Sequence, residues 1–243
     1  MSTARSNPDV RTRLVEATIR LLATTGPSEV KARSVSSEAG LSTMGVYTYF
    51  GGVPELLQAV ADEGLKRLAA AFEMVPATDD PIADLCSMAL AHRDVAQRNP
   101  HLYDLVFGLS IHGRYSLSWG TAAPVPSERS PAFEATYAQL IKACARLVDA
   151  NCVRKIDPSL IAMQLWSAVH GFVMLELADH FADVADPPSE ILVPMCNNLV
   201  VGLGAARKSV ECSTAAVIAE RATSLEGRSN GQRRQKPGKT KAK

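Results

Sequence analysis

The sequence lacks the cysteine pattern of a disulfide scaffold or a zinc site. Its five cysteines are odd in number, widely spaced and set in apolar surroundings, and none forms a close pair of the metal-binding or redox type. This usage favours reduced thiols inside a cytoplasmic protein. The residues concerned are Cys86, Cys144, Cys152, Cys196 and Cys212.

The sequence also lacks an uninterrupted apolar run long enough for a membrane span. The longest apolar stretch, residues 160–178, is interrupted by Gln164, His170 and Glu176, a pattern that suits a buried helix. The start of the chain is polar and has no apolar run of the kind found in signal peptides. We therefore expect a cytoplasmic protein without membrane contact.

Net charge is nearly absent as well. The 26 basic and 25 acidic residues leave a formal charge of +1, and 47% of the residues are hydrophobic, as in an ordinary soluble globular protein. This balance does not exclude DNA binding, because a regulator touches DNA over one small face. Residues 227–243 hold seven lysines and arginines, no acid and almost nothing apolar. We expect a disordered basic tail there.

Apolar residues with helical spacing occur along the whole chain, without the period-two alternation of strands. Several prolines stand where a helix would begin, in the turn that needs no backbone N–H. The chain is therefore predicted to be all-α, with a long loop at residues 110–130, which are rich in Gly, Ser, Thr and Pro. The expected helices span about residues 8–25, 32–39, 42–49, 54–74, 81–97, 100–108, 131–152, 158–182 and 187–203.

The segment from Arg33 to Phe50 carries the clearest functional pattern. Two short helices that cross steeply need a tight turn and a small contact, which Ala39 and Gly40 provide, because glycine tolerates the positive φ of a helix C-cap. Ser42 is placed to cap the second helix through its side chain. The pattern predicts a helix-turn-helix, and the alternative is a plain helical corner with no role in DNA binding.

The second short helix would present one face to DNA. Val46 and Phe50 are four residues apart and are expected to face inward, which leaves Thr43, Met44 and Tyr47 on the opposite face. The first residues of a recognition helix reach base edges, where a threonine hydroxyl donates or accepts hydrogen bonds and a methionine packs on a thymine methyl. The hydroxyls of Tyr47 and Tyr49 are expected to reach phosphates.

This module resembles the tetracycline-repressor (TetR) family over about residues 10–60. The match consists of Gly26, Ala39, Gly40, Leu41, Ser42, Val46, Tyr47, Tyr49, Phe50 and Leu56. The resemblance implies that Arg33 also contacts bases and that Gly45 faces the groove. The sequence departs from the family pattern at Lys31, Thr48 and Val53, where a capping threonine, an aromatic residue and a phosphate-binding lysine are common. The predicted DNA-binding set is Arg33, Ser42, Thr43, Met44, Gly45, Tyr47, Thr48 and Tyr49.

Two later segments resemble a subgroup of this family with a Trp-x-x-x-His-Gly signature. They are residues 99–107 and the run from Leu165 to Gly171, in which Trp166, His170 and Gly171 form the signature. The resemblance implies that the helices after the fourth form dimers and enclose a small molecule. We expect the helices that begin near residues 158 and 187 to form a four-helix dimer interface, because Gly202 and Gly204 permit close helix approach.

The apolar stripe of the helix after residue 158 permits two interpretations. A broad stripe of this kind is commonly protein core or dimer interface. Alternatively, some of its residues line a ligand cavity in which a few polar groups orient an apolar molecule. The residues predicted for such a cavity are Tyr103, Phe107, Trp166, His170 and Met174.

The sequence contains no convincing catalytic or metal-binding pattern. Glu176 and His180 are four residues apart and could face one metal ion, but no third ligand is indicated, and an exposed ion pair explains them better. There is no nucleophile elbow and no glycine-rich phosphate loop. We expect no enzymatic activity, no cofactor and no metal.

Taken together, these patterns predict a DNA-binding regulator of four segments. Residues 1–9 are expected to form a flexible arm, 10–53 the helix-turn-helix domain, 54–205 the effector-binding and dimerisation domain, and 206–243 a C-terminal extension ending in the basic tail. The predicted function is a homodimeric repressor that leaves a double-stranded DNA operator when a small apolar effector binds, with activation as the alternative mode of regulation. The alternatives are a ligand-independent DNA-coating protein that uses the tail, and a carrier or enzyme that uses the helical cavity alone.

Overall fold

A computed structural model describes residues 7–107 and 130–234, and this part of the chain is helical with no strand, as predicted. The ten α-helices are α1 (Asn7–Thr25), α2 (Ala32–Glu38), α3 (Met44–Phe50), α4 (Val53–Glu73), α5 (Pro81–Arg98), α6 (Pro100–Phe107), α7 (Pro131–Asp149), α8 (Pro158–Leu177), α9 (Val193–Gly202) and α10 (Arg207–Arg234).

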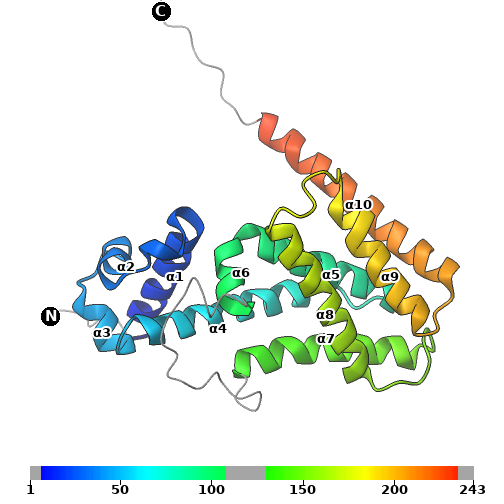
Figure 1. The fold of residues 1–243 in the computed structure, drawn as a ribbon, viewed down its shortest axis with the longest axis horizontal. Helices are drawn as coiled ribbons and strands as arrows, with labels where there is room; N and C mark the ends of the chain where they lie inside the picture. The colour runs from blue at the N-terminus through cyan, green and yellow to red at the C-terminus, as the bar shows by residue number, and fades with distance from the viewer. Residues whose placement is uncertain (1–6, 108–129, 235–243) are drawn as a thin grey trace, which may run out of the picture.

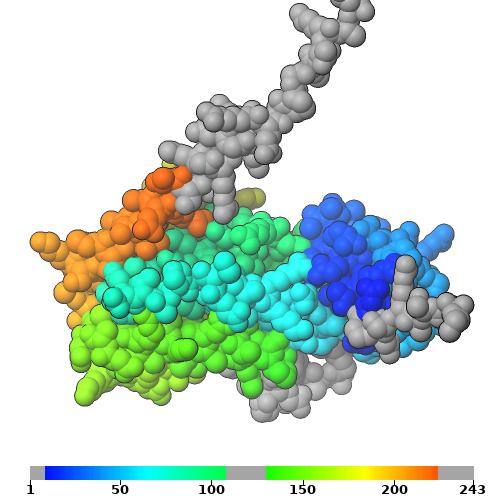
Figure 2. Space-filling model, turned by 180° about the vertical axis from the view of Figure 1, so that it is seen from behind, coloured from blue at the N-terminus to red at the C-terminus, as the bar shows by residue number. Residues whose placement is uncertain are grey.

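The helices form a small module at one end and a larger bundle at the other (Figure 1). Helices α1 to α3 make the small module, and the long helix α4 leaves it and runs into the bundle formed with α5 to α10. Figure 2 shows the opposite side, where α10 lies along one edge of the bundle and α7 along another. The two ends of α4 therefore belong to different parts of the molecule.

The small module has its own apolar core. Leu14 and Leu22 of α1 pack with Val35 of α2 and Val46 of α3, and all four side chains are fully buried. The first half of α4 and the buried Leu102 of α6 complete this core, with Leu105 and Val106 of α6 packed against it. Burial of a leucine or valine side chain contributes about 1.5–3 kcal/mol, so these contacts fix the short α2 and α3, which could not persist alone.

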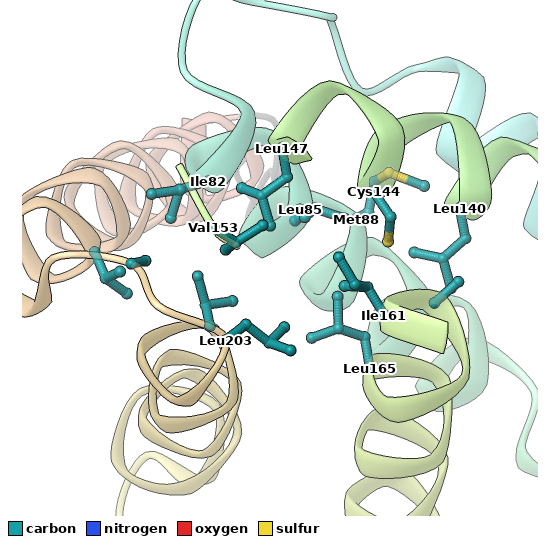
Figure 3. Packing of buried hydrophobic residues seen from close by; sticks show 14 of the residues in the cluster. Ile82, Leu85, Met88, Leu140, Cys144, Leu147, Val153, Ile161, Leu165 and Leu203 are labelled. Carbon is teal, nitrogen blue, oxygen red and sulfur yellow. The ribbon is translucent and has the colours of Figure 1, made fainter. Parts of the chain in front are cut away.

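The bundle has a second core at the far end of α4. Leu85 and Met88 of α5 meet Leu140 and Leu147 of α7 and Leu165 of α8 there (Figure 3). Leu68 and Phe72, from the second half of α4, also belong to this cluster. One continuous helix thus carries side chains of both the core of the small module and the core of the bundle.

Several helices begin where the sequence placed a proline after a capping residue. The Asp80 carboxylate accepts hydrogen bonds from the N–H groups of Ile82 and Ala83 at 3.1 and 3.0 Å at the start of α5. Ser130 and Asp157 cap α7 and α8 in the same way. These caps satisfy N–H groups that have no partner inside the helix.

The structure corrects the predicted end of one helix and confirms the start of the next. Helix α8 ends at Leu177 rather than near residue 182, because the chain turns at Asp179, which has a φ of 60°. The following helical segment begins at residue 187, as predicted, with a short π-helix, Pro188–Leu192, that continues directly into α9. The apolar pattern that continues past residue 177 did not reveal the turn at Asp179.

The structure also corrects the expected termini. Helix α10 continues to Arg234, so the prediction of a disordered segment from Gly227 is wrong for residues 227–234. Helix α1 begins at Asn7, so residues 7–9 of the expected N-terminal arm belong to this helix instead. Residues 1–6 and 235–243, like most of the loop predicted at residues 110–130, lie outside the described residues.

Within the described part, α8 is the helix that has the length and apolar composition to cross a membrane. It nevertheless packs against α5, α7 and α9. Its Ile161, Leu165 and Phe172 are buried in the bundle cores. Of its apolar window, 33% is buried inside the structure.

Candidate DNA-binding helix and effector cavity

The turn between α2 and α3 has the geometry that the sequence predicted. Gly40 has a φ of 64°, and its N–H bonds the carbonyl of Ser37 at 3.0 Å. The N–H of Leu41 bonds the carbonyl of Ser36 at 2.8 Å. A left-handed residue at this point satisfies the last carbonyls of α2 and turns the chain toward α3.

The predicted capping role of Ser42 is wrong. Helix α3 begins at Met44 and has Thr43 in the N-cap position, without a side-chain cap hydrogen bond. Ser42 contributes through its backbone instead, since its carbonyl accepts a hydrogen bond from the N–H of Gly45 at 2.9 Å. Thr43 already has helical torsions, φ −58° and ψ −29°, so the chain becomes helical one residue beyond the predicted cap.

Helix α3 presents the expected face to solvent. Val46 and Phe50 are buried, whereas Met44 is 68% and Tyr47 54% exposed. Exposed large apolar side chains on a short helix have no partner in the monomer and fit a contact surface. Thr43, Thr48 and Arg33 are exposed as well, and a side chain at Gly45 would meet open space.

Tyr49 differs from the other residues predicted to contact DNA. It is half-buried and packs against the core of the small module. Its backbone carbonyl accepts a hydrogen bond from the guanidinium of Arg11. The structure thus gives Tyr49 a packing role beside any phosphate contact through its hydroxyl.

Arginines of α1 hold the helix-turn-helix in place, a feature that the sequence analysis missed. The guanidinium of Arg11 lies 4.2 Å from the ring centroid of Phe50. Arg13 donates to the carbonyl of Ala39 at 2.7 Å, where α2 ends. Cation–π contacts and charge-assisted bonds of this kind orient the two short helices on α1.

A cavity of about 40 Å³ lies inside the bundle, between α4, α5, α7, α8, α9 and α10. It has room for a few water molecules, so a larger ligand must push its walls apart. Two of its thiols are protonated at neutral pH, because burial raises the pKa of Cys86 to about 12 and that of Cys196 to about 11. None of the lining residues is Asp, Glu, Lys or Arg; they are Phe72, Ile82, Leu85, Cys86, Met88, Ala89, His92, Leu140, Leu165, Trp166, Val169, Cys196, Asn197, Val200 and Thr214.

Three polar side chains form a buried hydrogen-bonded array beside this cavity. Nε2 of His92 lies 3.1 Å from Oη of Tyr103, and that oxygen lies 2.6 Å from Nδ1 of His170. We call His92, Tyr103 and His170 the His–Tyr–His relay. Burial, and then the neighbouring His170, lower the pKa of His92 well below its ordinary value. Burial also lowers the pKa of His170, from 6.5 to about 4, so both imidazoles are neutral at pH 7.

The structure places four of the five predicted ligand residues close together, but only one of them, Trp166, lines the cavity. Trp166 lines the cavity, whereas Tyr103, Phe107 and His170 lie beyond His92, and their rings pack on one another. Met174 packs against a neighbouring apolar cluster and does not line the cavity. The sequence analysis missed His92, the one relay residue that borders the cavity itself.

The expected ion pair between Glu176 and His180 is wrong. Glu176 is paired with Arg93 of α5 instead, at 2.7 Å, and it also accepts a bond from Gln97 at 2.8 Å. The end of α8 turns away at Asp179, so residue 180 no longer continues the helical face. No group of three potential metal ligands occurs within the described ranges, 7–107 and 130–234.

Helix α6 connects the relay to the small module. Tyr103 belongs to the relay and Phe107 packs on its rings, while Leu102 and Val106 pack on the core of the small module. The contact with α4 is close, because a Cβ added at Gly64 would lie 2.6 Å from Cγ2 of Val106. Displacement of the relay would therefore be felt at α1 and α4.

Helix α8 exposes an apolar face on the outside of the bundle. Leu160, Met163 and Leu175 are 45–51% exposed, and Ser167 and Gly171 lie between them on the same face. A side chain at Gly171 would meet nothing within 4 Å. The adjacent surface of α9 forms a shallow groove lined by Ile191, Met195 and Leu199 among others.

Comparison with known proteins relates the chain to transcriptional regulators. Residues 85–197 match the family model described as tetracyclin repressor-like, C-terminal domain. Over 207 residues the chain is 26% identical to the HTH-type nicotine-responsive transcriptional repressor HdnoR of Paenarthrobacter nicotinovorans, a match that covers 80% of this chain and 94% of that relative.

Solved structures share the fold. A protein of unknown function from Rhodococcus sp. RHA1 superposes with a TM-score of 0.66 at 23% identity, covering 83% of this chain and 97% of that one. RolR in complex with resorcinol superposes with a TM-score of 0.55 at 17% identity, covering 86% and 94%. Both similarities extend over the small module and the bundle together.

Proposed function

The chain belongs to the TetR family of transcriptional regulators. On this premise we propose that it is a homodimeric repressor, and that its affinity for operator DNA falls when a small molecule enters the bundle. The observation that carries the proposal is the exposed face of α3, with Met44 and Tyr47 outward and Val46 and Phe50 buried. A helix held by a closed core, with its apolar tip in solvent, fits the major groove.

The DNA contacts divide into two classes. Thr43, Met44 and Gly45 begin α3 and would approach base edges, with Arg33 of α2 beside them. Tyr47 and Thr48 would position the helix on the phosphates, which carries no sequence information. Ser42 keeps an exposed hydroxyl for such a contact, although it does not cap the helix.

The dimer interface would be the exposed face of α8 together with α9. Its small residues, Ser167 and Gly171, would let a partner helix approach closely, while Leu160, Met163 and Leu175 would be covered. Sedimentation equilibrium tests this: Gly171→Leu should shift the protein to monomer, whereas Ala216→Leu, on the exposed surface of α10, should not. A monomeric wild type would rule the dimer out.

The effector would enter the bundle between α4 and α8 and move the small module. Phe72 of α4 lines the cavity, and α6 joins the relay to Leu102 in the core of the small module. The nicotine-responsive relative and the resorcinol complex of RolR support a response to a small ring compound. A ligand that binds the open bundle better shifts the equilibrium toward it and thereby lowers operator affinity.

The test of the proposal is selection of operator DNA. Duplexes that contain a random region are selected on the purified protein, and the recovered sequences are footprinted. We expect a near-palindrome whose half-sites are separated by about 10 base pairs or a multiple of that. Protection without sequence preference would instead support the DNA-coating alternative, and absence of any protection would support a carrier.

A further inference from the structure

The His–Tyr–His relay has two arrangements of its protons. Oη of Tyr103 carries one proton, so it donates to one imidazole and must accept from the other. If it donates to Nδ1 of His170, then Nε2 of His170 carries a proton and is a donor. If it donates to Nε2 of His92, then Nε2 of His170 is an acceptor. Nε2 of His170, the free end of the relay, can therefore bind either a hydrogen-bond donor or a hydrogen-bond acceptor.

That free end is unsatisfied in the structure. Nε2 of His170 is buried and has no hydrogen-bond partner in the part of the chain that the structure describes. The His170 ring lies among aromatic rings, with its centroid 4.4 Å from that of Trp166 and 4.5 Å from that of Phe107. Buried polar atoms are almost always paired, and an orphaned one often marks a functional site.

Trp166 contacts both the cavity and this end of the relay. Its indole lines the cavity, and its ring centroid lies 4.4 Å from that of His170. Phe133 and Tyr137 of α7 also pack on the indole, with centroids 5.9 and 5.4 Å away. A flat molecule that displaces the indole would occupy the cavity and reach the relay at once.

Within residues 7–107 and 130–234, no unpaired charge lines the cavity to match an ion. The cavity is lined by neutral side chains, and the buried carboxylates of Asp84 and Glu176 are already paired with Arg146 and Arg93. The relay does not supply a cation either, because the pKa of His170 is about 4 and only about one ring in a thousand is protonated at pH 7. An ion placed here would be buried without a counter-charge, which is strongly unfavourable.

We propose that the effector is an uncharged ring compound whose hydrogen-bonding group binds Nε2 of His170 at the end of the relay. The inference rests on the proposed function only in calling this ligand the effector. The relay adjusts its protons to the ligand, so a phenol and a ketone would both be accepted.

Four one-ring probes test the proposal by isothermal titration calorimetry at pH 7: phenol, toluene, benzoate and benzylammonium. Phenol should bind about tenfold more tightly than toluene, as expected for one net hydrogen bond, and both ions should bind more weakly than toluene. In ¹⁵N spectra, phenol should convert His170 to a single tautomer.

Three variants locate the hydrogen bond. His170→Phe should remove the preference for phenol over toluene, and Tyr103→Phe should leave the preference but abolish the coupled tautomer change at His92. Thr214→Val removes a hydroxyl from another wall of the cavity, and should leave both observations unchanged. If His170→Phe does not fold, the Tyr103→Phe spectra still decide whether the relay responds.

The proposal is overturned if either ion binds as tightly as phenol, since tight benzylammonium binding would make the aromatic rings a cage for cations. It is also overturned if Thr214→Val alone removes the preference, or if no uncharged probe binds up to its solubility limit. Operator binding is measured separately on the ligand-free protein, so failure of the proposed function is distinguishable from failure of the ligand assignment.

Discussion

Asn99 joins α6 to α1 through one side chain. Its Nδ2 donates a hydrogen bond to the carbonyl of Ile19 at 3.2 Å, while its Oδ1 accepts from the N–H of Leu102 at 3.0 Å. The side chain is buried, so both bonds are shielded from water. The residue that caps the helix carrying Tyr103 and Phe107 thus also holds the first helix of the DNA-binding module.

Asn99→Ser should separate these two roles. A serine hydroxyl can still cap α6, but it is too short to reach Ile19, whose carbonyl then loses a buried partner. We expect the free energy of unfolding to fall by about 1–3 kcal/mol. We also expect ligand to weaken operator binding less than in the wild type, measured by fluorescence anisotropy. An unchanged ligand response would show that the coupling does not pass through this bond.

Gly64→Ala tests the close contact between α4 and α6. The new methyl group would lie 2.6 Å from Cγ2 of Val106, so the helices must move apart. Overpacking of this kind costs about 1–3 kcal/mol in urea unfolding. Gly45→Ala is the control, because a side chain there meets open space, and it should stabilise α3 by about 0.5–1 kcal/mol. Equal effects of the two substitutions would contradict the packing argument.

Met44→Ala and Tyr47→Ala should each weaken binding to the selected operator by about 1–3 kcal/mol, without loss of stability. Both side chains are more than half exposed and contribute little to the core. Met74→Ala is the matched control, since Met74 is 83% exposed but lies at the other end of α4. Loss of operator affinity in the Met74 variant would move the DNA-binding surface away from α3.

Acid should destabilise the fold through the two buried imidazoles. Burial lowers the pKa of His170 from 6.5 to about 4, and it also lowers the pKa of His92 well below its ordinary value. The unfolded chain therefore binds protons below pH 6.5 that the native chain does not bind. Stability is therefore complete above about pH 6.5 and falls as the pH drops from 6.5 toward 4. Between pH 7 and 5 the loss through His170 should be about 2 kcal/mol, and His92 should add to the loss in the same direction.

Urea unfolding of the wild type and of His170→Phe at several pH values measures this loss. The variant should retain the contribution of His92 and lose that of His170, so its stability should depend less steeply on pH. Parallel pH profiles for the two proteins would mean that the pKa of His170 is the same in the folded and the unfolded chain, and that folding does not lower it.

The sequence predicted those features that depend on local periodicity. The spacing of Val46 and Phe50 placed their side chains inside and Met44 and Tyr47 outside, as the structure confirms. Helix α10 escaped prediction because its segment has few apolar residues and no clear helical stripe. It is held by tertiary contacts instead, such as the bidentate ion pair between Arg221 and Asp94 of α5 at 2.6 and 2.8 Å.

The relay could not be predicted from periodicity. Tyr103 follows His92 by 11 positions and precedes His170 by 67, so only the packing of α5, α6 and α8 brings the three together. Its signal in the sequence is a single histidine on the apolar face of α5, next to buried residues such as Met88 and Ala96. The predicted ligand residues missed most of the cavity for the same reason. Its walls come from six helices, so they depend on tertiary packing and not on local periodicity.

Helix α4 acts as a lever arm. Its 21 residues span about 31 Å, with Phe72 at the cavity end and Leu56 in the core of the small module at the other. A tilt of about 5° at the cavity end would carry the far end through about 3 Å, close to the rise of one base step. In a two-fold dimer both arms swing, so a ligand barely larger than an aromatic ring could take the recognition helices out of register with successive major grooves.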